Sequence, residues 1–570
     1  MYEGCKDRSP YQTILFAQKF LLKNNILVTE KWNMTVAGLY SVHLKIDGTK
    51  FFANGKGVTK VLALASGYGE LMERLQNMAF FRMDSELYED EIIDFAGNID
   101  LIKWEELLKK KFDTKQMKII EAYSGLGLMN CSSIIYKNID DNSDLCLPVK
   151  LVNIFYGTNG MAAGNTYEEC LVQGYSEILE RYVTACYIRE RRIATTIRRE
   201  SLLEFPQLLG LIEKIEKEGT YTIKLKDMSL GKDIPAVGLI LYNNKTLEYF
   251  VKVAVHPVFE IAIQRCFTEL MQGKTLENYT GLRNIFDTLE DAYDFENVME
   301  IFKNGSGDYP VEFILGENDH IFKSQHFKHY VTNQEMKEYL EELIKKLGYQ
   351  IYIQDVTCSE IKSVHILIPG MSEIFVDMNN LKLLEDEIMF RRIKALILNK
   401  IGCLTKEDAN VILSFMESID LNHDCNMADF LRVSKIRYYY QYKSVSVRLF
   451  MSMLYILCEN FDNAAKLIEE HQKKEKNHNA KMYYKCYALL LRLKKEKKNI
   501  TSLRSSLNML FSEVLVDKVS EDIEKYPFSS FDRRGCDYKC LECTYHKQCV
   551  NEKEYLLYKK MMGIRYEKAI

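Results

Sequence analysis

Short runs of alternating hydrophobic and polar residues mark the first two thirds of the chain. Four of these runs, each bounded by turn residues, predict strands: YSVHLKI (40–46), YTIKLKD (221–227), AVGLILY (236–242) and SVHILIPG (363–370). Between them, apolar residues recur at i, i+3 and i+4, which predicts helices over 60–83, 166–192 and 257–273. This part of the chain is therefore expected to fold as an α+β domain.

From about residue 385 to 525 the strand signals fade and amphipathic helical segments follow one another. Small residues such as Ala464 and Ala465 fall where two helices would pack closely, which is typical of a helical-hairpin array resembling tetratricopeptide repeats. We predict three parts: an α+β domain over 1–382, an all-α, tetratricopeptide-like domain over 383–525, and a Cys-rich tail with a terminal helix over 526–570.

The length and net charge of the chain exclude some classes of protein. At 570 residues the chain is too long for one ordinary core. A formal net charge of -4 offers no global basic field for neutralising phosphates, so we do not expect a dedicated nucleic-acid-binding protein. The start, MYEGCKDRSPYQT, has no apolar core segment, and no window reaches the roughly 18 apolar residues of a membrane span. We expect a cytoplasmic protein without membrane contact, in which scattered cysteines such as Cys170, Cys266, Cys403 and Cys458 are reduced and buried.

An internal repeat places acidic residues on two predicted helices. Residues 54–77 and 159–184 both begin with Asn-Gly, run through Gly-containing segments, and end in E-x-x-E-R. In each copy the two glutamates are spaced i, i+3, so both carboxylates project from one helical face. The repeated residues are Glu70, Glu73 and Arg74 in the first copy, and Glu177, Glu180 and Arg181 in the second. A third predicted helix, 258–272, carries Arg265 and Glu269 at i, i+4.

Carboxylates gathered from several helices suit a magnesium or manganese site, because hard oxygen ligands match these cations. Magnesium prefers to share its coordination shell with phosphates, so a nucleotide triphosphate is the expected ligand, with Arg181 and Arg265 on its phosphate oxygens. The alternative is an exposed helical face with i, i+4 salt links. The segment NGKGVTK lacks the phosphate-loop spacing, although Lys56 and Lys60 could approach an anion from a glycine turn. His256, next to a proline, is expected to be a structural turn residue rather than a base.

Four long blocks resemble the YcaO family and occur in its order: FFANGKGVTKVLALASGYGELMERLQNMAFF, TNGMAAGNTYEECLVQGYSEILERYV, VHPVFEIAIQRCFTELMQGK and IPGMSEIF. The resemblance implies an ATP-binding fold in which glutamates hold two magnesium ions, and an enzyme that phosphorylates an amide oxygen of a protein or peptide substrate. It assigns Glu70 and Glu177 to one magnesium, and Glu73, Glu180 and Glu269 to the other. It assigns nucleotide contacts to Asn165, Glu169 and Arg265, with Ser66 and Arg181 nearby, and to Lys6 and Thr13 near the N-terminus, where Thr replaces the family's Ser.

The helical region resembles the extension of the stand-alone bacterial subgroup of this family. Azoline-forming members usually end in Pro-x-Pro-x-Pro, whereas this chain ends in MGIRYEKAI. The stand-alone subgroup is linked to β-methylthiolation of an aspartate in a small-subunit ribosomal protein, as an accessory to a radical methylthiotransferase. The resemblance implies that role and a homodimer. A non-catalytic adaptor, or an azoline- or thioamide-forming enzyme, remains the alternative.

Four cysteines gather near the C-terminus in the spacing C-x3-C-x2-C-x5-C, with His546 among them. In a protein expected to be cytoplasmic, four thiols within fourteen residues point to a metal before disulfides. Zinc and an iron–sulfur cluster both accept four thiolates, so the pattern leaves the two open, beside the alternative of reduced thiols without metal. The predicted ligands are Cys536, Cys540, Cys543 and Cys549.

Overall fold

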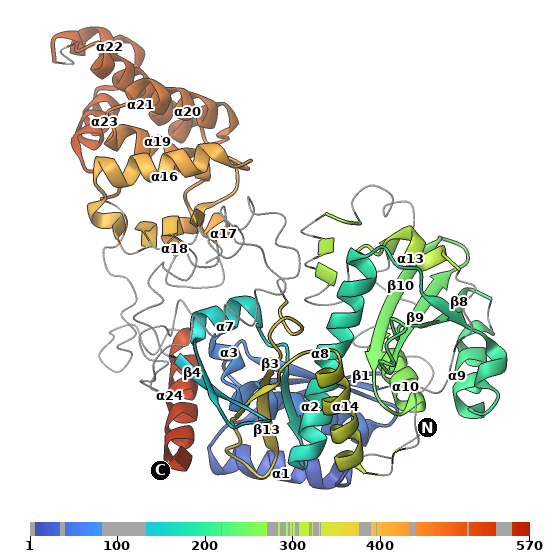
Figure 1. The fold of residues 1–570 in the computed structure, drawn as a ribbon. Coiled ribbons are helices and arrows are strands. Elements are labelled where there is room, and N and C mark those ends of the chain that lie inside the picture. The colour runs from blue at the N-terminus through green and yellow to red at the C-terminus, as the bar shows by residue number, and fades with distance from the viewer. Residues whose placement is uncertain are drawn as a thin grey trace. The chain divides into compact units, whose positions relative to one another are not determined.

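The structure, a computed structural model, divides into two compact units (Figure 1). The first comprises Met1–Leu381 together with Leu556–Ile570, and the second comprises Lys382–Tyr555. The structure describes residues 6–34, 40–82, 133–217, 219–270, 283–284, 292–294, 297–298, 300–301, 307–317, 322, 330, 332–374, 389–390, 392–394, 396–398, 400–431, 440–498, 501–529, 531 and 550–569.

Three antiparallel sheets form the frame of the first unit. The first has the order β1-β2-β3, formed by Val28–Met34, Tyr40–Ile46 and Phe52–Gly57. The second has the order β5-β4-β12-β13-β6, in which β4 is Ser133–Asn138, β5 Asp144–Pro148, β6 Met161–Gly164, β12 Tyr352–Asp355 and β13 Lys362–Leu367. The third has the order β11-β10-β9-β8-β7, in which β7 is Thr195–Ile197, β8 Tyr221–Asp227, β9 Ala236–Asn243, β10 Glu248–Val255 and β11 Arg283–Asn284.

Helices pack against these sheets. The two that matter most for the site are α2 (Lys60–Gln76) and α8 (Tyr167–Arg189) (Figure 1). The others in this unit are α1 (Pro10–Lys23), α3 (Ala79–Arg82), α7 (Val149–Phe155), α9 (Pro206–Glu216), α10 (Phe259–Leu270), α13 (Val311–Leu315) and α14 (Asn333–Lys346).

Two glycines let strand β3 lie directly against helix α2. A Cβ on Gly55 would sit 2.0 Å from the carbonyl oxygen of Ala63, and one on Gly57 would sit 2.5 Å from the amide nitrogen of Ala63. No side chain fits there, so glycine is required by the close approach of two backbones. The segment around Lys56 is therefore strand rather than the glycine turn considered from the sequence.

The second copy of the repeat builds the same strand-to-helix junction. A Cβ on Gly164, the last residue of β6, would sit 2.5 Å from the amide nitrogen of Cys170 in α8. Both helices begin after a threonine N-cap, Thr59 and Thr166, whose hydroxyl accepts the N–H three residues on. The two copies thus align on G-x-T rather than on the Asn-Gly pairs: Asn54-Gly55 lies in a strand, whereas Asn159-Gly160 lies in a turn before β6.

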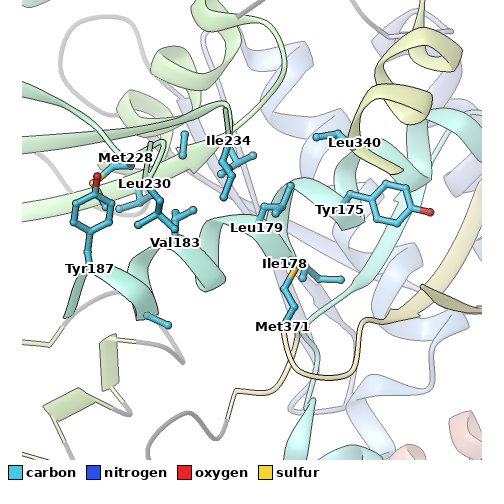
Figure 2. Packing of buried hydrophobic residues seen from close by; sticks show 14 of the residues in the cluster. Tyr175, Ile178, Leu179, Val183, Tyr187, Met228, Leu230, Ile234, Leu340 and Met371 are labelled. Carbon is cyan, nitrogen blue, oxygen red and sulfur yellow. The ribbon is translucent and has the colours of Figure 1, made fainter. Parts of the chain in front are cut away.

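A large apolar cluster fixes α8 in place. From this helix Tyr175, Ile178 and Leu179 are buried and point into the cluster, and other elements surround them (Figure 2). The surrounding residues include Met228, Leu230, Ile234, Leu340 and Met371. Burial of several large side chains on one helix contributes about 1.5–3 kcal/mol for each, so the polar side chains of α8 project from a rigid support.

The second unit is helical throughout the part described. Successive helices pack pairwise, with Ala464 and Ala465 fully buried where α20 meets its neighbours. Its helices are α16 (Lys406–Ser418), α17 (Met427–Phe430), α18 (Tyr440–Lys443), α19 (Val447–Leu457), α20 (Phe461–Lys474), α21 (His478–Lys495), α22 (Arg504–Leu510) and α23 (Glu513–Glu524). The predicted helical character of this region is confirmed for these residues, and the resemblance to tetratricopeptide repeats stays a prediction.

The last helix, α24 (Val550–Ala569), packs from Leu556 onward as part of the first unit. Leu557, Tyr558 and Met561 are buried, and the ring of Tyr558 meets that of Phe81 edge to face at 5.4 Å. Lys560 Nζ donates a hydrogen bond of 2.5 Å to the carbonyl oxygen of Asn24 at the end of α1.

The predicted fold class is confirmed in its architecture: an α+β domain is followed by a helical region. The predicted helix over 60–83 is interrupted at Met78, whose φ of 57° breaks the helix between α2 and α3. Cys170 and Cys266 are buried as expected, but Cys403 is exposed and Cys458 half-buried. None of the helices in the described residues is long and apolar enough to cross a membrane.

Candidate functional site

Helices α2 and α8 bring glutamates of the two repeats together. Glu70 and Glu73 come from α2 and Glu177 comes from α8; Glu177 raises the pKa of both α2 glutamates, and Glu70 also raises that of Glu73. Each carboxylate also lies near an arginine of its own helix: Arg74 is 3.8 Å from Glu70 and 3.7 Å from Glu73, and Arg181 donates to Glu177 at 2.9 Å. The i, i+4 salt links considered as an alternative are therefore present, within an acidic cluster rather than on an isolated helical face.

Burial disfavours the charged forms of the two α2 carboxylates in this cluster. Burial, together with the carboxylates of Glu177 and Glu70, raises the pKa of Glu73 to about 8 against the opposing effects of Arg74 and Arg181. Burial also raises the pKa of Glu70, with Glu177 adding to the effect, while Arg74, Lys56 and a backbone hydrogen bond from Asn54 oppose it. The side chains of Glu70, Glu73 and Glu177 are 33%, 15% and 27% exposed, so solvent and ions can reach them.

The structure gives fewer contacts for three other residues of the predicted site. Glu180 is half-buried on α8 and adds to the raised pKa of the buried phenol Tyr309. Glu269 lies in α10, but its side chain is outside the described residues. Ser66 is half-buried one turn before Glu70 on α2.

Within the described residues, no three His, Cys, Asp or Glu side chains are close enough together to hold one metal ion. The donor chemistry nevertheless fits magnesium, because carboxylate oxygens are its preferred protein ligands and a divalent cation would favour the charged forms of these buried carboxylates. Cys536, Cys540, Cys543 and Cys549 lie outside the described residues, so the zinc or iron–sulfur site stays a prediction.

A second polar cluster forms where the N-terminal segment meets the first turn of α8. Lys6 Nζ donates to Glu169 Oε1 at 2.8 Å, and the backbone N–H of Asp7 donates to Oε2 at 3.1 Å. Thr13 Oγ1 donates to Asn165 Oδ1 at 2.8 Å, and Asn165 Nδ2 donates to both oxygens of Glu169 at 3.1 Å. Four residues that the sequence assigned to one site thus share one hydrogen-bonded network.

Glu169 stays ionised in this network although it is buried. Burial alone would raise the pKa of its carboxyl, but the charge and hydrogen bond of Lys6, with the N–H of Asp7 and the amide of Asn165, lower it overall. Asn165 and Glu169 are both only 4% exposed. Lys6 is therefore half-exposed, and the buried carboxylate of Glu169 holds its ammonium group in place.

Arg265 from α10 reaches the same end of α8. Its guanidinium donates to Gln173 Oε1 at 2.6 Å and to the carbonyl oxygen of Val255 at 3.4 Å. His256, directly after Val255, is buried, and its pKa falls well below the ordinary value because of burial and of the charges of Arg265 and Lys6. Sequence reasoning missed Gln173, which occupies the position of Ser66 in the other repeat, and it treated His256 as a turn residue only.

The two clusters share helix α8. Glu169 and Glu177 are eight residues apart, which corresponds to about 12 Å along a helix. One end therefore offers Lys6 and Arg265 for an anion, and the other offers carboxylates for a cation. A metal–polyphosphate complex needs this pairing of a cationic and an anionic pole within a short distance.

Comparisons with known proteins identify the family of this chain. The family model described as YcaO cyclodehydratase, ATP- and Mg2+-binding, matches residues 54–372. An Escherichia coli protein, ribosomal protein S12 methylthiotransferase accessory factor YcaO, is 28% identical over 366 residues, which cover 60% of this chain and 61% of that protein. An uncharacterized Haemophilus influenzae protein is 27% identical over 383 residues, covering 63% of this chain and 64% of that protein. The chain thus matches these curated relatives over about six tenths of their length.

Two solved structures are similar at lower identity. A heterocyclase in complex with substrate and cofactor is 17% identical with a TM-score of 0.47, covering 65% of this chain and 53% of that chain. YcaO from Methanopyrus kandleri, bound with AMPPCP and Mg2+, is 16% identical with a TM-score of 0.42, covering 66% of this chain and 96% of that chain. The family model, which spans more than half of the sequence, decides the assignment: this chain belongs to the YcaO family.

Proposed function

We propose that this protein is an ATP- and magnesium-dependent enzyme that activates a backbone amide of a protein or peptide by phosphorylating its oxygen. The observation that carries the proposal is the acidic cluster of Glu70, Glu73 and Glu177, in which burial and mutual repulsion raise the pKa of Glu73 to about 8. An enzyme without a bound cation has no use for such an arrangement, because it costs folding free energy. Lys6 and Arg265, which contact Glu169 and Gln173 of α8, form a cationic pole that supports a triphosphate as the ligand.

Magnesium would neutralise the polyphosphate oxygens and strengthen the electrophilic character of the γ-phosphorus. The residues proposed to hold it are Glu70 and Glu177 for one ion, and Glu73, Glu180 and Glu269 for a second. Lys6, Thr13, Asn165, Glu169 and Arg265 would position the nucleotide, with Ser66 and Arg181 beside them. Because α2 and α8 are both buried along one face, these side chains need little reorganisation when the substrate binds.

In the proposed reaction the amide oxygen attacks the γ-phosphorus and the bond to the bridging β,γ-oxygen breaks, so that ADP leaves. The carbonyl carbon of the O-phosphorylated amide then accepts a nucleophile, such as a Cys, Ser or Thr side chain or sulfide. The new carbon–nucleophile bond forms, the bond from carbon to the phosphorylated oxygen breaks, and inorganic phosphate leaves. The role of the protein is to position the triphosphate and neutralise its charge.

The name of the Escherichia coli relative, ribosomal protein S12 methylthiotransferase accessory factor, supports an accessory role beside a methylthiotransferase. We propose the same setting for this chain, with a small-subunit ribosomal protein as the substrate or its carrier, and a homodimer as the working form. The helical second unit, residues 382–555, would supply the protein-binding surface.

Nucleotide turnover with magnesium tests the proposal. We expect Glu73→Gln and Glu180→Gln to lower turnover by about a hundredfold or more, because each removes charge that stabilises the phosphoryl-transfer transition state. Glu213→Gln is the matched control, since Glu213 is exposed on α9. If both site variants, correctly folded, retain the wild-type rate, the proposed site is wrong. If the wild type itself shows no turnover with any peptide, the adaptor alternative is favoured.

A further inference from the structure

The three-stranded sheet β1-β2-β3 packs one of its faces against helix α2. Val42 and Leu44 of β2 are fully buried on that face. Because side chains alternate along a strand, His43 and Lys45 project from the opposite face. The pairing of β1 and β3 with β2 extends this opposite face, which we call the outer face, across all three strands.

The register of the strands sets the composition of the outer face, because directly opposite residues of antiparallel strands lie on the same face. Two adjacent rows across the sheet are Lys31, His43 and Asn54, and Thr29, Lys45 and Phe52. Lys31, Lys45 and Phe52 are exposed, Phe52 to 48%. Thr29 Oγ1 donates to Asp47, which directly follows β2. The outer face is therefore a polar, basic surface around an exposed aromatic ring.

The ring of Phe52 is supported from one side by that of His43. The two centroids are 4.8 Å apart and the ring planes differ by 34°. His43 Nδ1 lies 2.9 Å from Asn54 Oδ1 and donates to it, since an amide oxygen only accepts, so the imidazole is held in place. Among the described hydrogen bonds none uses Asn54 Nδ2, which leaves its N–H groups for a ligand. The face thus combines a fixed aromatic platform with an amide donor.

Positive charge prevails on the outer face. Glu30 is the only acidic residue in the sequences of the three strands. It lies opposite the buried Leu44, on the other face, where Tyr68 Oη donates to it at 3.1 Å. Lys31 and Lys45 form no ion pair within the described part of the chain. Both lysines are therefore available to an anionic ligand.

We propose that the outer face binds single-stranded RNA, with a base stacked on Phe52 and neighbouring phosphates contacted by Lys31 and Lys45. Aromatic rings next to basic side chains bind single strands in this way, because every base has a π-face and every phosphate a negative charge. The N–H groups of Asn54 favour RNA over DNA, since they can donate to a 2′-hydroxyl.

This inference goes beyond the proposed amide activation and needs neither nucleotide nor metal in the acidic cluster. The net charge of -4 is compatible with it, because charges farther away than about 10 Å are largely screened at ordinary salt concentrations. A basic face of local extent is sufficient for a few phosphate contacts.

Fluorescence anisotropy of the full-length protein with a fluorescein-labelled oligouridine of about twelve nucleotides tests the inference. Phe52→Leu keeps an apolar side chain but removes the ring, and should weaken binding about tenfold. Phe52→Tyr keeps the ring and should bind within about twofold of the wild type. Combined Lys31→Gln and Lys45→Gln should lower the slope of log affinity against log salt concentration by about 1.4, or about 0.7 for each phosphate contact.

The matched control combines Lys214→Gln and Lys245→Gln, which removes the same charge from two exposed lysines of the same unit that lie outside this sheet. It should leave affinity and salt slope unchanged. Wild-type binding by Phe52→Leu, or an equal loss of slope in both double variants, overturns the inference. So does equal or tighter binding of oligodeoxyuridine or of an oligoglutamate peptide to the wild type. If Phe52→Leu does not fold, Phe52→Met is measured in its place.

Discussion

Lys6 Nζ lies 2.8 Å from Glu169 Oε1, although the two residues are 163 positions apart in the sequence. The side chain of Lys6 is 51% exposed and that of Glu169 is 4% exposed. A cation that faces solvent therefore covers one side of a buried carboxylate. The contact ties the N-terminal segment to the first turn of α8. Four predictions follow from this pair and from three other features of the first unit.

Lys6→Met should reduce the free energy of unfolding at pH 7 by about 1–2 kcal/mol, because a buried carboxylate loses its charged partner. The pKa of Glu169 is lowered in the folded state, so the pair stabilises above the ordinary carboxyl pKa and this stabilisation is lost as the pH falls through the folded value. The difference between variant and wild type should therefore shrink toward pH 4. Urea unfolding at the two pH values measures it. Lys137→Met, which breaks an exposed pair with Asp144, should change stability by less than about 0.5 kcal/mol.

Glu73→Gln should stabilise the metal-free protein at pH 8. The pKa of Glu73 is about 8 in the folded state against 4.5 ordinarily, so between these values the folded protein holds a proton that the unfolded chain has lost. Wild-type stability should fall as the pH rises through this window, by up to about 1.4 kcal/mol per pH unit relative to the variant. Thermal unfolding from pH 5 to 8.5 measures the slopes. Parallel curves for the two proteins would contradict the prediction, and added Mg2+ should stabilise the wild type more than the variant.

Gly55→Ala should destabilise the first unit by more than about 3 kcal/mol, or prevent its folding, because the new Cβ would overlap the backbone of α2 at Ala63. Gly69→Ala is the control in the same helix, where an added Cβ meets nothing within 4 Å. It should be neutral or stabilise by up to about 1 kcal/mol, because alanine favours helix. Circular dichroism and urea titration of both variants decide. Equal stability of the two variants would mean that β3 and α2 are not packed as described.

Leu557→Ala should reduce the free energy of unfolding by about 2–4 kcal/mol, because Leu557 is buried at 6% exposure in the first unit. The neighbouring residue Leu556 is 44% exposed, so Leu556→Ala should cost less than about 0.5 kcal/mol. The pair tests whether the terminal helix is docked along the face that carries Tyr558. A similar loss for both variants, measured by chemical denaturation, would place the helix in another orientation.

The sequence was most informative where the pattern was local. Strands β2 and β8 coincide with the alternating runs over 40–46 and 221–227, because one face of each is buried and the other is polar. Strand β3 could not be predicted, since its residues FANGKG are typical of a turn. They form a strand because the missing side chains allow contact with α2, and that reason lies outside the segment itself.

The sequence predicted most residues of the candidate site, but only some of the contacts between them. The repeat named Glu70, Glu73 and Glu177, and the structure brings these three into mutual electrostatic contact. The partner of Arg265 among the described contacts, Gln173, was not predicted, because a lone glutamine on a helix carries no signal of its own. Aligning the two repeats on G-x-T would have pointed to it, as the counterpart of Ser66.

The docking of the terminal helix changes how the chain should be divided for experiments. The polypeptide leaves the first unit after Leu381 and rejoins it at Leu556, so the helical array is an insertion rather than an appendage. A premature stop anywhere in residues 382–555 also removes from the first unit a helix whose Leu557, Tyr558 and Met561 are buried, so a resulting loss of function would say nothing about the helical array. To test the role of the helical array, residues 382–555 should be deleted and Leu381 joined to Leu556 by a flexible linker. The terminal helix then stays in the first unit.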